Sequence, residues 1–323
     1  MDIFYEQKIK KRIAVAVAVL GCVLMIGFPD IALLSARKGI LLWAGNVLPA
    51  LLPFFICVSF ITSLGIAKDL PRGIFVFVMS VLAGYPMGAR LVGSMAQRGE
   101  IDAWEARRLI AFGTTAGPTF LLGSVGIGML GSHSAGIVLA LSHYGGALLS
   151  GAVLMILSAQ HMHRKRSYGI SFVKSTRRNE KKGSLDRKEN DSESLFAVFT
   201  SSILSALRSL GIVLAYLVLF MFITDFIQDS GLLDFIPMPE GRALLKGIFE
   251  MTVGCSALSQ TAILPARKTV FAAFLVSFGG LSVIGQSMSM LGDCGVTLRY
   301  FLLLKLCHGA LAAGIAGIIL TFL

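Results

Sequence analysis

The sequence predicts an all-α polytopic membrane protein built from two inverted repeats, each with a re-entrant helical hairpin, a broken transmembrane helix and a plain transmembrane helix. Hydrophobic residues make up 55% of the 323-residue chain and the mean hydropathy is +0.78, whereas soluble domains contain about 45–50% apolar residues. Several apolar runs reach the roughly 20 residues that a helix needs to cross the hydrocarbon layer. Glycine and proline interrupt some of these runs at corresponding places in the two halves.

The basic residues lie in short segments between the apolar runs and give a formal net charge of +11. Membrane topology produces this placement, so we expect a lipid bilayer as partner and no nucleic acid. The five cysteines are scattered, without a CxxC pair or a histidine at metal-ligand spacing, and they predict packing roles with neither metal nor cofactor. The sequence contains no Walker A loop, HExxH or GxSxG motif, so we expect no enzyme.

The chain is expected to form one membrane domain in four segments. A transmembrane helix occupies residues 1–38, the first repeat 39–158, a basic cytoplasmic loop 159–195, and the second repeat 196–323. The N-terminal run KIKKRIAVAVAVLGCVLMIGF starts with basic residues, as a signal peptide does, but it lacks a small-x-small cleavage site. We therefore expect a retained first helix.

The first repeat is predicted element by element from its interruptions. Spans are expected at 13–34 and 39–65, and the latter contains Pro49 and Pro53. The next run, GIFVFVMSVLAGYPMGARLVGSMAQRG, is broken by glycine and proline and contains Arg90, which predicts a re-entrant hairpin of two half-helices. The run IAFGTTAGPTFLLGSVGIGML is broken at its Ala-Gly-Pro and predicts a broken span, which a plain crossing at 134–158 follows.

The second repeat echoes this order after a span that ends near Ile227. LLKGIFEMTVGCSALSQTAILPARK is too short and too polar for a plain crossing and predicts the second hairpin. KTVFAAFLVSFGGLSVIGQSMSML is broken at its Gly-Gly, and residues 297–322 form the last crossing. A shift of 162 places Gly117 on Gly279, and a shift of 163 places Gly146-Ala147-Leu148 on Gly309-Ala310-Leu311. The two halves are therefore predicted to be related repeats.

The orientation follows from lysine and arginine in short loops, which favour the cytoplasmic side. Four basic groups then lie on one side: Lys8, Lys10, Lys11 and Arg12; Lys68 and Arg72; Arg98, Arg107 and Arg108; and the 159–195 loop. This places the N-terminus in the cytoplasm and makes the two hairpins enter from opposite sides. Two basic pairs, Arg37-Lys38 and Arg267-Lys268, fall on the opposite side.

Four breaks at membrane depth predict a cavity, because unpaired backbone in hydrocarbon persists only where it packs in protein or lines water. Inverted repeats with discontinuous helices are typical of secondary transporters, and half-helix N-termini there suit an anionic solute. The candidate solute-binding residues are the polar side chains near the breaks: Tyr85, Arg90, Thr114, Thr115, Thr119, Glu250, Thr252, Ser256, Gln260, Ser282, Gln286 and Ser287. Each hydroxyl can instead bond a carbonyl that the break frees.

Ionisable residues inside apolar segments indicate function by default, with mutual pairing or snorkelling as the alternative. Arg90 and Glu250 fit this description. His143 and His308 each precede the Gly-Ala of a matching span and could relay protons. A packed neutral histidine that bonds a neighbour is the simpler interpretation of both.

Four motifs resemble those of the sporulation integral membrane protein family of the YlbJ type: LAGYPMGARL, EARRLIAFGTTAGPTFLLGSVGIGML, HYGGALLSG and FGGLSVIGQSMSML. That family belongs to the nucleoside-recognition, or Gate-domain, superfamily, which is distantly similar to the concentrative nucleoside transporters. The resemblance covers roughly residues 40–158 and 200–320. It implies export of dipicolinic acid from the mother cell toward the forespore, in the cell membrane or outer forespore membrane, and a homo-oligomer, a trimer by analogy with those transporters.

The sequence departs from the family pattern in two places near the presumed site. GTTAGP carries fewer Asn and Ser residues before its Gly-Pro, and Ile284 stands where a histidine often occurs. The primary hypothesis is a secondary carrier of a small anionic metabolite. The alternatives are a non-transporting scaffold or gate protein of sporulation, and a nucleoside-type carrier. Convergence of Arg90 and the hydroxyl-rich breaks on one cavity would favour the carrier.

Overall fold

The computed structural model describes residues 2–65, 70–167 and 194–323, and every regular element in these ranges is helical. Four helical stretches are long and apolar enough to cross a membrane: His133–Leu154, Leu195–Asp229, Pro265–Leu291 and Leu298–Thr321; a bent N-terminal pair adds a fifth. The protein is therefore an all-α, multi-pass membrane protein. The predicted basic loop at 159–195 lies mostly outside the described residues, as does Lys68.

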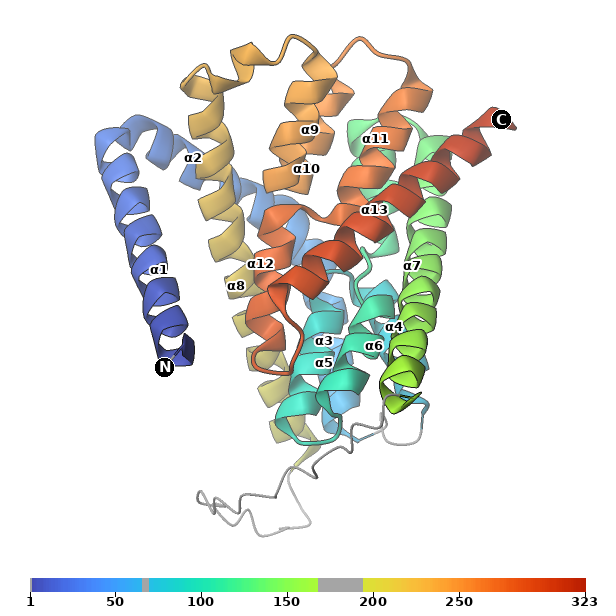
Figure 1. Ribbon diagram of the computed structural model, residues 1–323. Coiled ribbons are helices and arrows are strands. Elements are labelled where there is room, and N and C mark those ends of the chain that lie inside the picture. Colours follow the sequence, from blue (N-terminus) through green and yellow to red (C-terminus); the bar gives the residue numbers. More distant parts are fainter. Residues whose placement is uncertain (1, 66–69, 168–193) are drawn as a thin grey trace.

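The N-terminal helices meet at a sharp bend. Helix α1 (Asp2–Gly27) and helix α2 (Pro29–Leu42) lie at 103° to each other. Pro29 stands at the start of α2, where its missing N–H costs nothing, whereas in a continuous helix it would break the backbone ladder. The predicted span at 13–34 thus extends across the bend, and the first helix ends earlier than expected. Figure 1 shows α1 standing apart while α2 crosses to the rest of the molecule.

The predicted span at 39–65 is irregular. A π-helical turn, η1 (Trp43–Val47), joins α2 to α3 (Leu48–Ser63). Proline residues follow this turn closely, with Pro49 at the start of α3 and Pro53 within it. In membrane helices, a local π turn can satisfy backbone groups that a nearby proline leaves without their usual partners.

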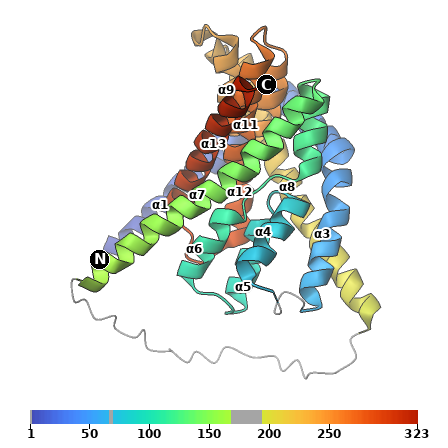
Figure 2. The ribbon, with the colours of Figure 1, turned by 90° about the vertical axis from the view of Figure 1, so that its right-hand side faces the viewer.

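Two helical hairpins occupy opposite ends of the molecule (Figures 1 and 2). The first consists of α4 (Arg72–Ala83) and α5 (Met87–Gln97) at the lower end of Figure 1. The second consists of α9 (Pro239–Phe249) and α10 (Met251–Ser259) at the upper end. The arms of the first hairpin separate at the predicted glycine and proline interruption, and those of the second separate at Glu250, for which the sequence predicted no break point.

Two broken spans run beside the hairpins. In the first, α6 (Ala103–Phe112) ends before a non-helical stretch at 113–117, and the π-helical η3 (Thr119–Met129) continues it. In the second, α11 (Pro265–Phe278) and α12 (Gly280–Leu291) meet at two glycines with positive φ. These interruptions coincide with the predicted Ala-Gly-Pro and Gly-Gly breaks.

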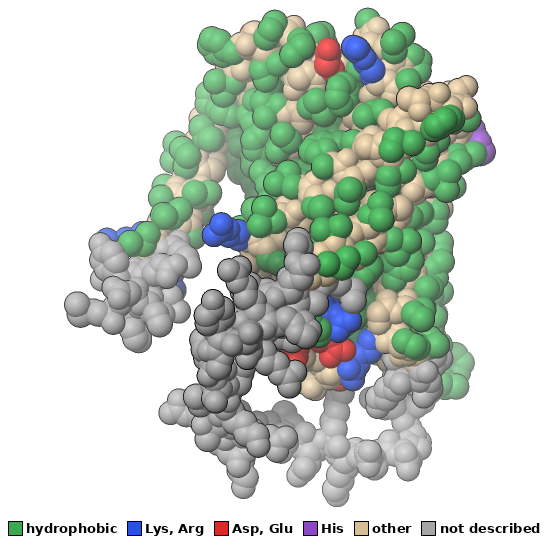
Figure 3. Space-filling model, turned by 45° about the vertical axis from the view of Figure 1, so that its right-hand side comes forward, with side chains coloured by type: hydrophobic (Ala, Val, Ile, Leu, Met, Phe, Trp, Pro, Cys, Tyr) green, Lys and Arg blue, Asp and Glu red, His purple; other side chains and the backbone are tan. Residues whose placement is uncertain are grey.

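Three long helices frame these discontinuous elements: α7 (His133–Ser167), α8 (Leu195–Asp229) and α13 (Leu298–Thr321). A short 3-10 helix, η4 (Leu232–Phe235), follows α8. Helices α7 and α13 lie side by side along much of their length (Figure 2). Hydrophobic side chains cover most of the face shown in Figure 3, and many large apolar side chains are exposed, Val17 and Leu141 among them. Such a surface suits contact with lipid.

Candidate functional site

The hairpins and broken spans meet through glycines at the centre of the molecule. A Cβ placed on Gly84 would lie only 2.7 Å from the backbone nitrogen of Gly117. A Cβ on Gly280 would lie 3.0 Å from the carbonyl oxygen of Gly247. Gly84 and Gly280 also have positive φ, a conformation that L side chains rarely adopt. Each hairpin therefore packs its backbone directly against one break.

A cavity of about 90 Å³ lies between these contacts. Both hairpins, both broken spans, α3 and α8 contribute to its wall. Four of the predicted solute-binding residues line it: Tyr85, Glu250, Thr252 and Gln286. The rest of the wall is mostly apolar, with Gly84 and Gly117 among the lining residues. The structure thus brings predicted residues from both halves of the chain to one central cavity.

Tyr85 connects this cavity to a buried lysine. Its hydroxyl accepts a hydrogen bond from Lys305 Nζ at 2.7 Å and lies 3.3 and 3.4 Å from the carbonyl oxygens of Val276 and Ser277. Lys305 Nζ also donates to the carbonyl oxygen of Thr114 at 3.3 Å. The Lys305 side chain is 0% exposed. It therefore joins the tip of the first hairpin to the ends of both broken helices.

Two buried histidines complete this polar network. The backbone N–H of Ala116 donates to His143 Nε2 at 2.8 Å. His143 Nε2 must therefore carry a lone pair, so the neutral ring bears its hydrogen on Nδ1 and donates it to Ser277 Oγ at 2.8 Å. His308 Nε2 lies 2.8 Å from the carbonyl oxygen of His143, and its Nδ1 lies 3.5 Å from Lys305 Nζ. These bonds agree with the interpretation of packed histidines bonded to neighbours.

Glu250 caps the second hairpin. Its carboxylate Oε2 accepts from the backbone N–H of Val253 at 2.8 Å, at the N-terminus of α10. A negative charge at this position is stabilised by the positive end of the helix dipole. Glu250 is buried and forms no ion pair within the described part of the chain. Glu250 thus has a structural role as the N-terminal cap of α10, and it also lines the central cavity.

The remaining polar residues at the breaks divide into buried and exposed groups. Ser282 accepts from Gln286 Nε2 at 3.1 Å. Thr115 Oγ1 and Ser287 Oγ are buried without a hydrogen-bond partner among the described residues. Thr119 and Gln260 are exposed, and Ser256 is half-buried. Thr114, Thr115, Thr119, Ser256 and Ser282 do not line the central cavity.

Arg90 does not reach the central cavity. It lines a separate polar pocket of about 360 Å³ between α3, α5 and α8, together with Arg208 and several serines. Arg90 Nη2 donates to Ser205 Oγ, and Arg90 Nη1 is buried without a partner in the described chain. Arg90 and the hydroxyl-rich breaks therefore do not converge on one cavity, because α5 turns this side chain toward α8, and the feature that would favour the carrier over the scaffold is not found.

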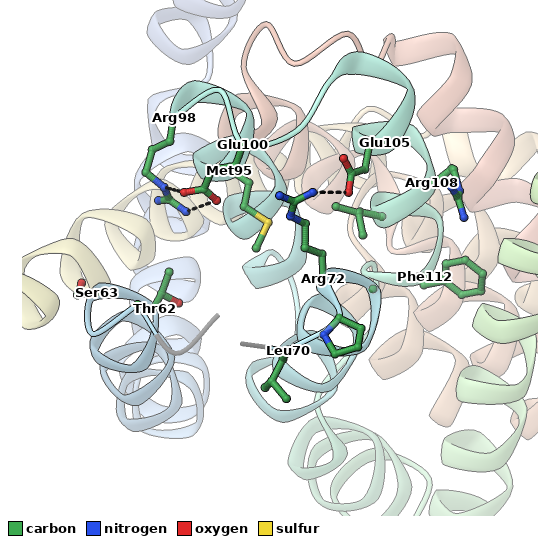
Figure 4. Close-up of a pocket in the computed structure, with 14 residues that line it drawn as sticks. Thr62, Ser63, Leu70, Arg72, Met95, Arg98, Glu100, Glu105, Arg108 and Phe112 are labelled. Atoms are coloured by element: carbon green, nitrogen blue, oxygen red, sulfur yellow. Dashed lines mark hydrogen bonds and ion pairs between the residues drawn. The ribbon is translucent and has the colours of Figure 1, made fainter. Parts of the chain in front are cut away.

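A larger depression of about 910 Å³ opens beside the Arg90 pocket at the lower end. Thr62, Ser63 and Arg98 line both. Figure 4 shows the ion pair between Arg72 and Glu105, with Nη1 and Oε1 3.0 Å apart, and the pair between Arg98 and Glu100. The lower end thus presents a broad depression whose wall carries several basic side chains.

Lys305 was missed by the sequence analysis, although its signal was present. It lies within FLLLKLCHGA, an apolar run treated as a plain crossing. The rule that singled out Arg90 and Glu250, an ionisable residue inside an apolar segment, applies equally to Lys305.

Comparison with known proteins finds a relative that matches most of the chain. The chain is 28% identical over 316 residues to the sporulation integral membrane protein YlbJ of Bacillus subtilis (strain 168). The match covers 90% of this chain and 78% of that protein. No family model and no solved structure matches the chain. The similarity supports the resemblance to the YlbJ-type family and agrees with a multi-pass membrane protein.

Proposed function

We propose that the protein is a secondary carrier of a small anionic metabolite, with dipicolinic acid as its solute. In this proposal it moves the solute from the mother cell toward the forespore during sporulation. The name of its relative supports a role in sporulation, and the motif resemblance supports the solute. The observation that carries the proposal is the central cavity, which both hairpins and both broken spans border.

Two inverted repeats would give such a carrier its alternating access. The contacts follow an offset of 163 residues, one more than the shift that places Gly117 on Gly279: it relates Gly84 to Gly247, Gly117 to Gly280 and Gln97 to Gln260. Gly84 packs against Gly117, and Gly247 packs against Gly280. The same hairpin-to-break contact therefore occurs twice, at equivalent positions. The placement of the hairpins at opposite ends supports the inversion (Figure 1).

The charge distribution supports a cytoplasmic lower end. Arg72, Arg98 and Arg108 lie around the lower depression, and Figure 3 shows basic side chains gathered at that end. At the other end, Lys38 pairs with Asp225 and Lys268 donates to a carbonyl oxygen of α10, so these cations have local partners. We propose a cytoplasmic N-terminus, residence in the cell membrane or outer forespore membrane, and assembly as a homo-oligomer, a trimer by analogy.

The size of the central cavity is consistent with a closed arrangement of the hairpins. Its volume of about 90 Å³ is below the range of about 300–1,000 Å³ typical of ligand pockets. A solute of the size of dipicolinic acid would require one hairpin to move away from its break. Movement of that kind, at one end or the other, is what alternating access between repeats requires.

Equilibrium binding to the detergent-purified protein tests this proposal. We expect wild type to bind dipicolinate and not uridine. Gln286→Met should weaken binding by about tenfold or more, because it removes a buried polar group from the cavity at similar volume. Gln97→Met is the matched control on an exposed surface and should bind like wild type.

Three outcomes would contradict the proposal. Folded wild type that binds neither ligand would favour the scaffold hypothesis. Selective uridine binding would favour a nucleoside-type carrier. Dipicolinate binding that Gln286→Met leaves unchanged would place the solute outside the central cavity.

A further inference from the structure

We infer that Lys305 is a proton-binding residue that takes up one proton together with the anionic solute, so that solute movement is coupled to protons. This inference rests on the proposed carrier function and identifies its coupling ion. Lys305 forms no ion pair with a carboxylate in the described chain. A buried cation without a partner is costly.

The surroundings of Lys305 suit both protonation states. Its three neighbours are the Tyr85 hydroxyl, the Thr114 carbonyl and His308 Nδ1, and none of them is a fixed charge. As an ammonium, Nζ donates to all three. As a neutral amine, Nζ donates to Thr114 and His308 and offers its lone pair to the Tyr85 O–H. The change requires only a rotation of that O–H group.

The bonds that Tyr85 gives up in this rotation are weak. Its hydroxyl lies 3.3 and 3.4 Å from the carbonyl oxygens of Val276 and Ser277, which is long for an O–H donor. These carbonyls belong to the last turn of α11, whose negative dipole end stabilises a nearby cation. The ammonium form of Lys305 is therefore stabilised, and the amine form loses only two long hydrogen bonds of Tyr85.

Tyr85 lines the cavity and therefore links the protonation state of Lys305 to it. In the amine form the Tyr85 hydrogen is committed to Nζ. In the ammonium form Nζ donates to the Tyr85 oxygen, and the O–H can turn from its long bonds with the Val276 and Ser277 carbonyls toward a carboxylate of the solute. An anion that accepts this hydrogen bond therefore binds when Nζ has gained a proton from solution. The neutral amine plus a proton becomes an ammonium, which offsets one negative charge of the solute.

Other titratable groups around Lys305 have defined bonding. His308 lies on the same helix, and α7 contributes His143 and Tyr144, whose hydroxyl donates to the Ala116 carbonyl. His143 is held neutral by the Ala116 N–H. The contacts from α11 and α12 are neutral, with Gly279 beside the Lys305 side chain. Glu250, across the cavity from this network, is the competing proton site.

The test measures proton uptake when dipicolinate binds to the purified protein in weakly buffered solution with a pH indicator. We expect wild type to take up about one proton per dipicolinate. At pH values where Lys305 is unprotonated in the ligand-free protein, the affinity for dipicolinate should fall by up to about tenfold per unit rise in pH. Lys305→Arg carries a permanent charge and should bind without proton uptake. Lys305→Met should bind more weakly and also without proton uptake.

Lys268→Met is the control and should retain proton uptake, whereas Glu250→Gln tests the competing proton site. Lys268 lies near the outer end of α11 and donates to the Ser259 carbonyl. Wild type that binds dipicolinate without proton uptake would overturn the inference and leave the carrier intact. Uptake that persists in folded Lys305→Arg, or that Glu250→Gln abolishes, would also overturn it. Wild type that binds no dipicolinate would remove the proposed function and the inference together.

Discussion

Single glycines set the closest backbone contacts in this protein. A Cβ on Gly88 would lie 1.6 Å from the carbonyl oxygen of Gly113, so the first hairpin and the first broken span can approach only without a side chain there. We predict that Gly88→Ala destabilises the protein by about 3 kcal/mol, because backbone atoms cannot yield as a flexible side chain can. Thermal unfolding in detergent measures the change.

Gly21→Ala is the matched control, since it also replaces a helical glycine but has no atom within 4 Å of the new Cβ. It should leave stability unchanged or raise it by up to about 1 kcal/mol. Equal unfolding temperatures for the two variants would show that the hairpin does not pack as described.

The position of Arg90 leads to a different prediction about solute binding from the one that its sequence context suggests. Because it lies in the lower polar pocket and not in the central cavity, Arg90→Ala should slow dipicolinate uptake into vesicles by about tenfold at low salt through lost electrostatic attraction. The equilibrium Kd should change little. Arg242→Ala, at the opposite end and paired with Asp234, is the control for uptake. Loss of equilibrium binding in Arg90→Ala would instead place the solute in the lower pocket.

For single residues, the sequence predicted which side chains are functional candidates better than it predicted where those side chains lie in the fold. Tyr85, Glu250, Thr252 and Gln286 share a cavity, whereas Arg90 does not. The direction of Arg90 depends on packing against α8, which begins more than 100 residues later in the chain. No local pattern around Arg90 contains that information.

Among the helices, the short arm α10 depends on its first residue. Glu250 accepts the Val253 N–H, so Glu250→Ala should lower stability by about 1 kcal/mol through loss of the cap. Glu250→Gln keeps an acceptor oxygen and should lose less. Unfolding temperatures of both variants test this, with Glu240→Ala as control because Glu240 lies in the first turn of α9 without a capping bond. A larger loss in Glu240→Ala would refute the capping role.

Helix ends were predictable where glycine and proline cluster, as at Gly84 to Pro86 and at Gly279-Gly280. The bend before Pro29 was missed, because the apolar run continues through it and hydropathy does not register a single proline. The irregular turn at Trp43–Val47 was likewise hidden inside a run that looked like one span.

For the whole molecule, the two-fold arrangement makes a topological prediction. Gln97 and Gln260 end the second arms of the two hairpins, are exposed and are separated by 163 positions. In protein with Cys22, Cys57 and Cys307 replaced by alanine, Gln97→Cys and Gln260→Cys should react with a membrane-impermeant maleimide from opposite sides of the membrane. Labelling of both from one side would contradict inverted repeats.

The order of hairpin, broken span and plain span followed from interruptions in the apolar runs, because each interruption reflects local backbone chemistry. The network of Tyr85, His143 and Lys305 did not, because these residues come from three segments that only the assembled fold brings together. Composition and the long apolar runs predicted the membrane class, since 55% hydrophobic residues exceed the roughly 45–50% of soluble domains.

Transport by the purified protein in proteoliposomes tests the central claim most directly. Vesicles with wild type should accumulate labelled dipicolinate faster than empty vesicles, Gln97→Met should match wild type, and Gln286→Met should be slowed by about tenfold or more. Wild type that binds dipicolinate in detergent but moves none across the membrane, in vesicles where it is folded and correctly inserted, would contradict a carrier with its site at the central cavity.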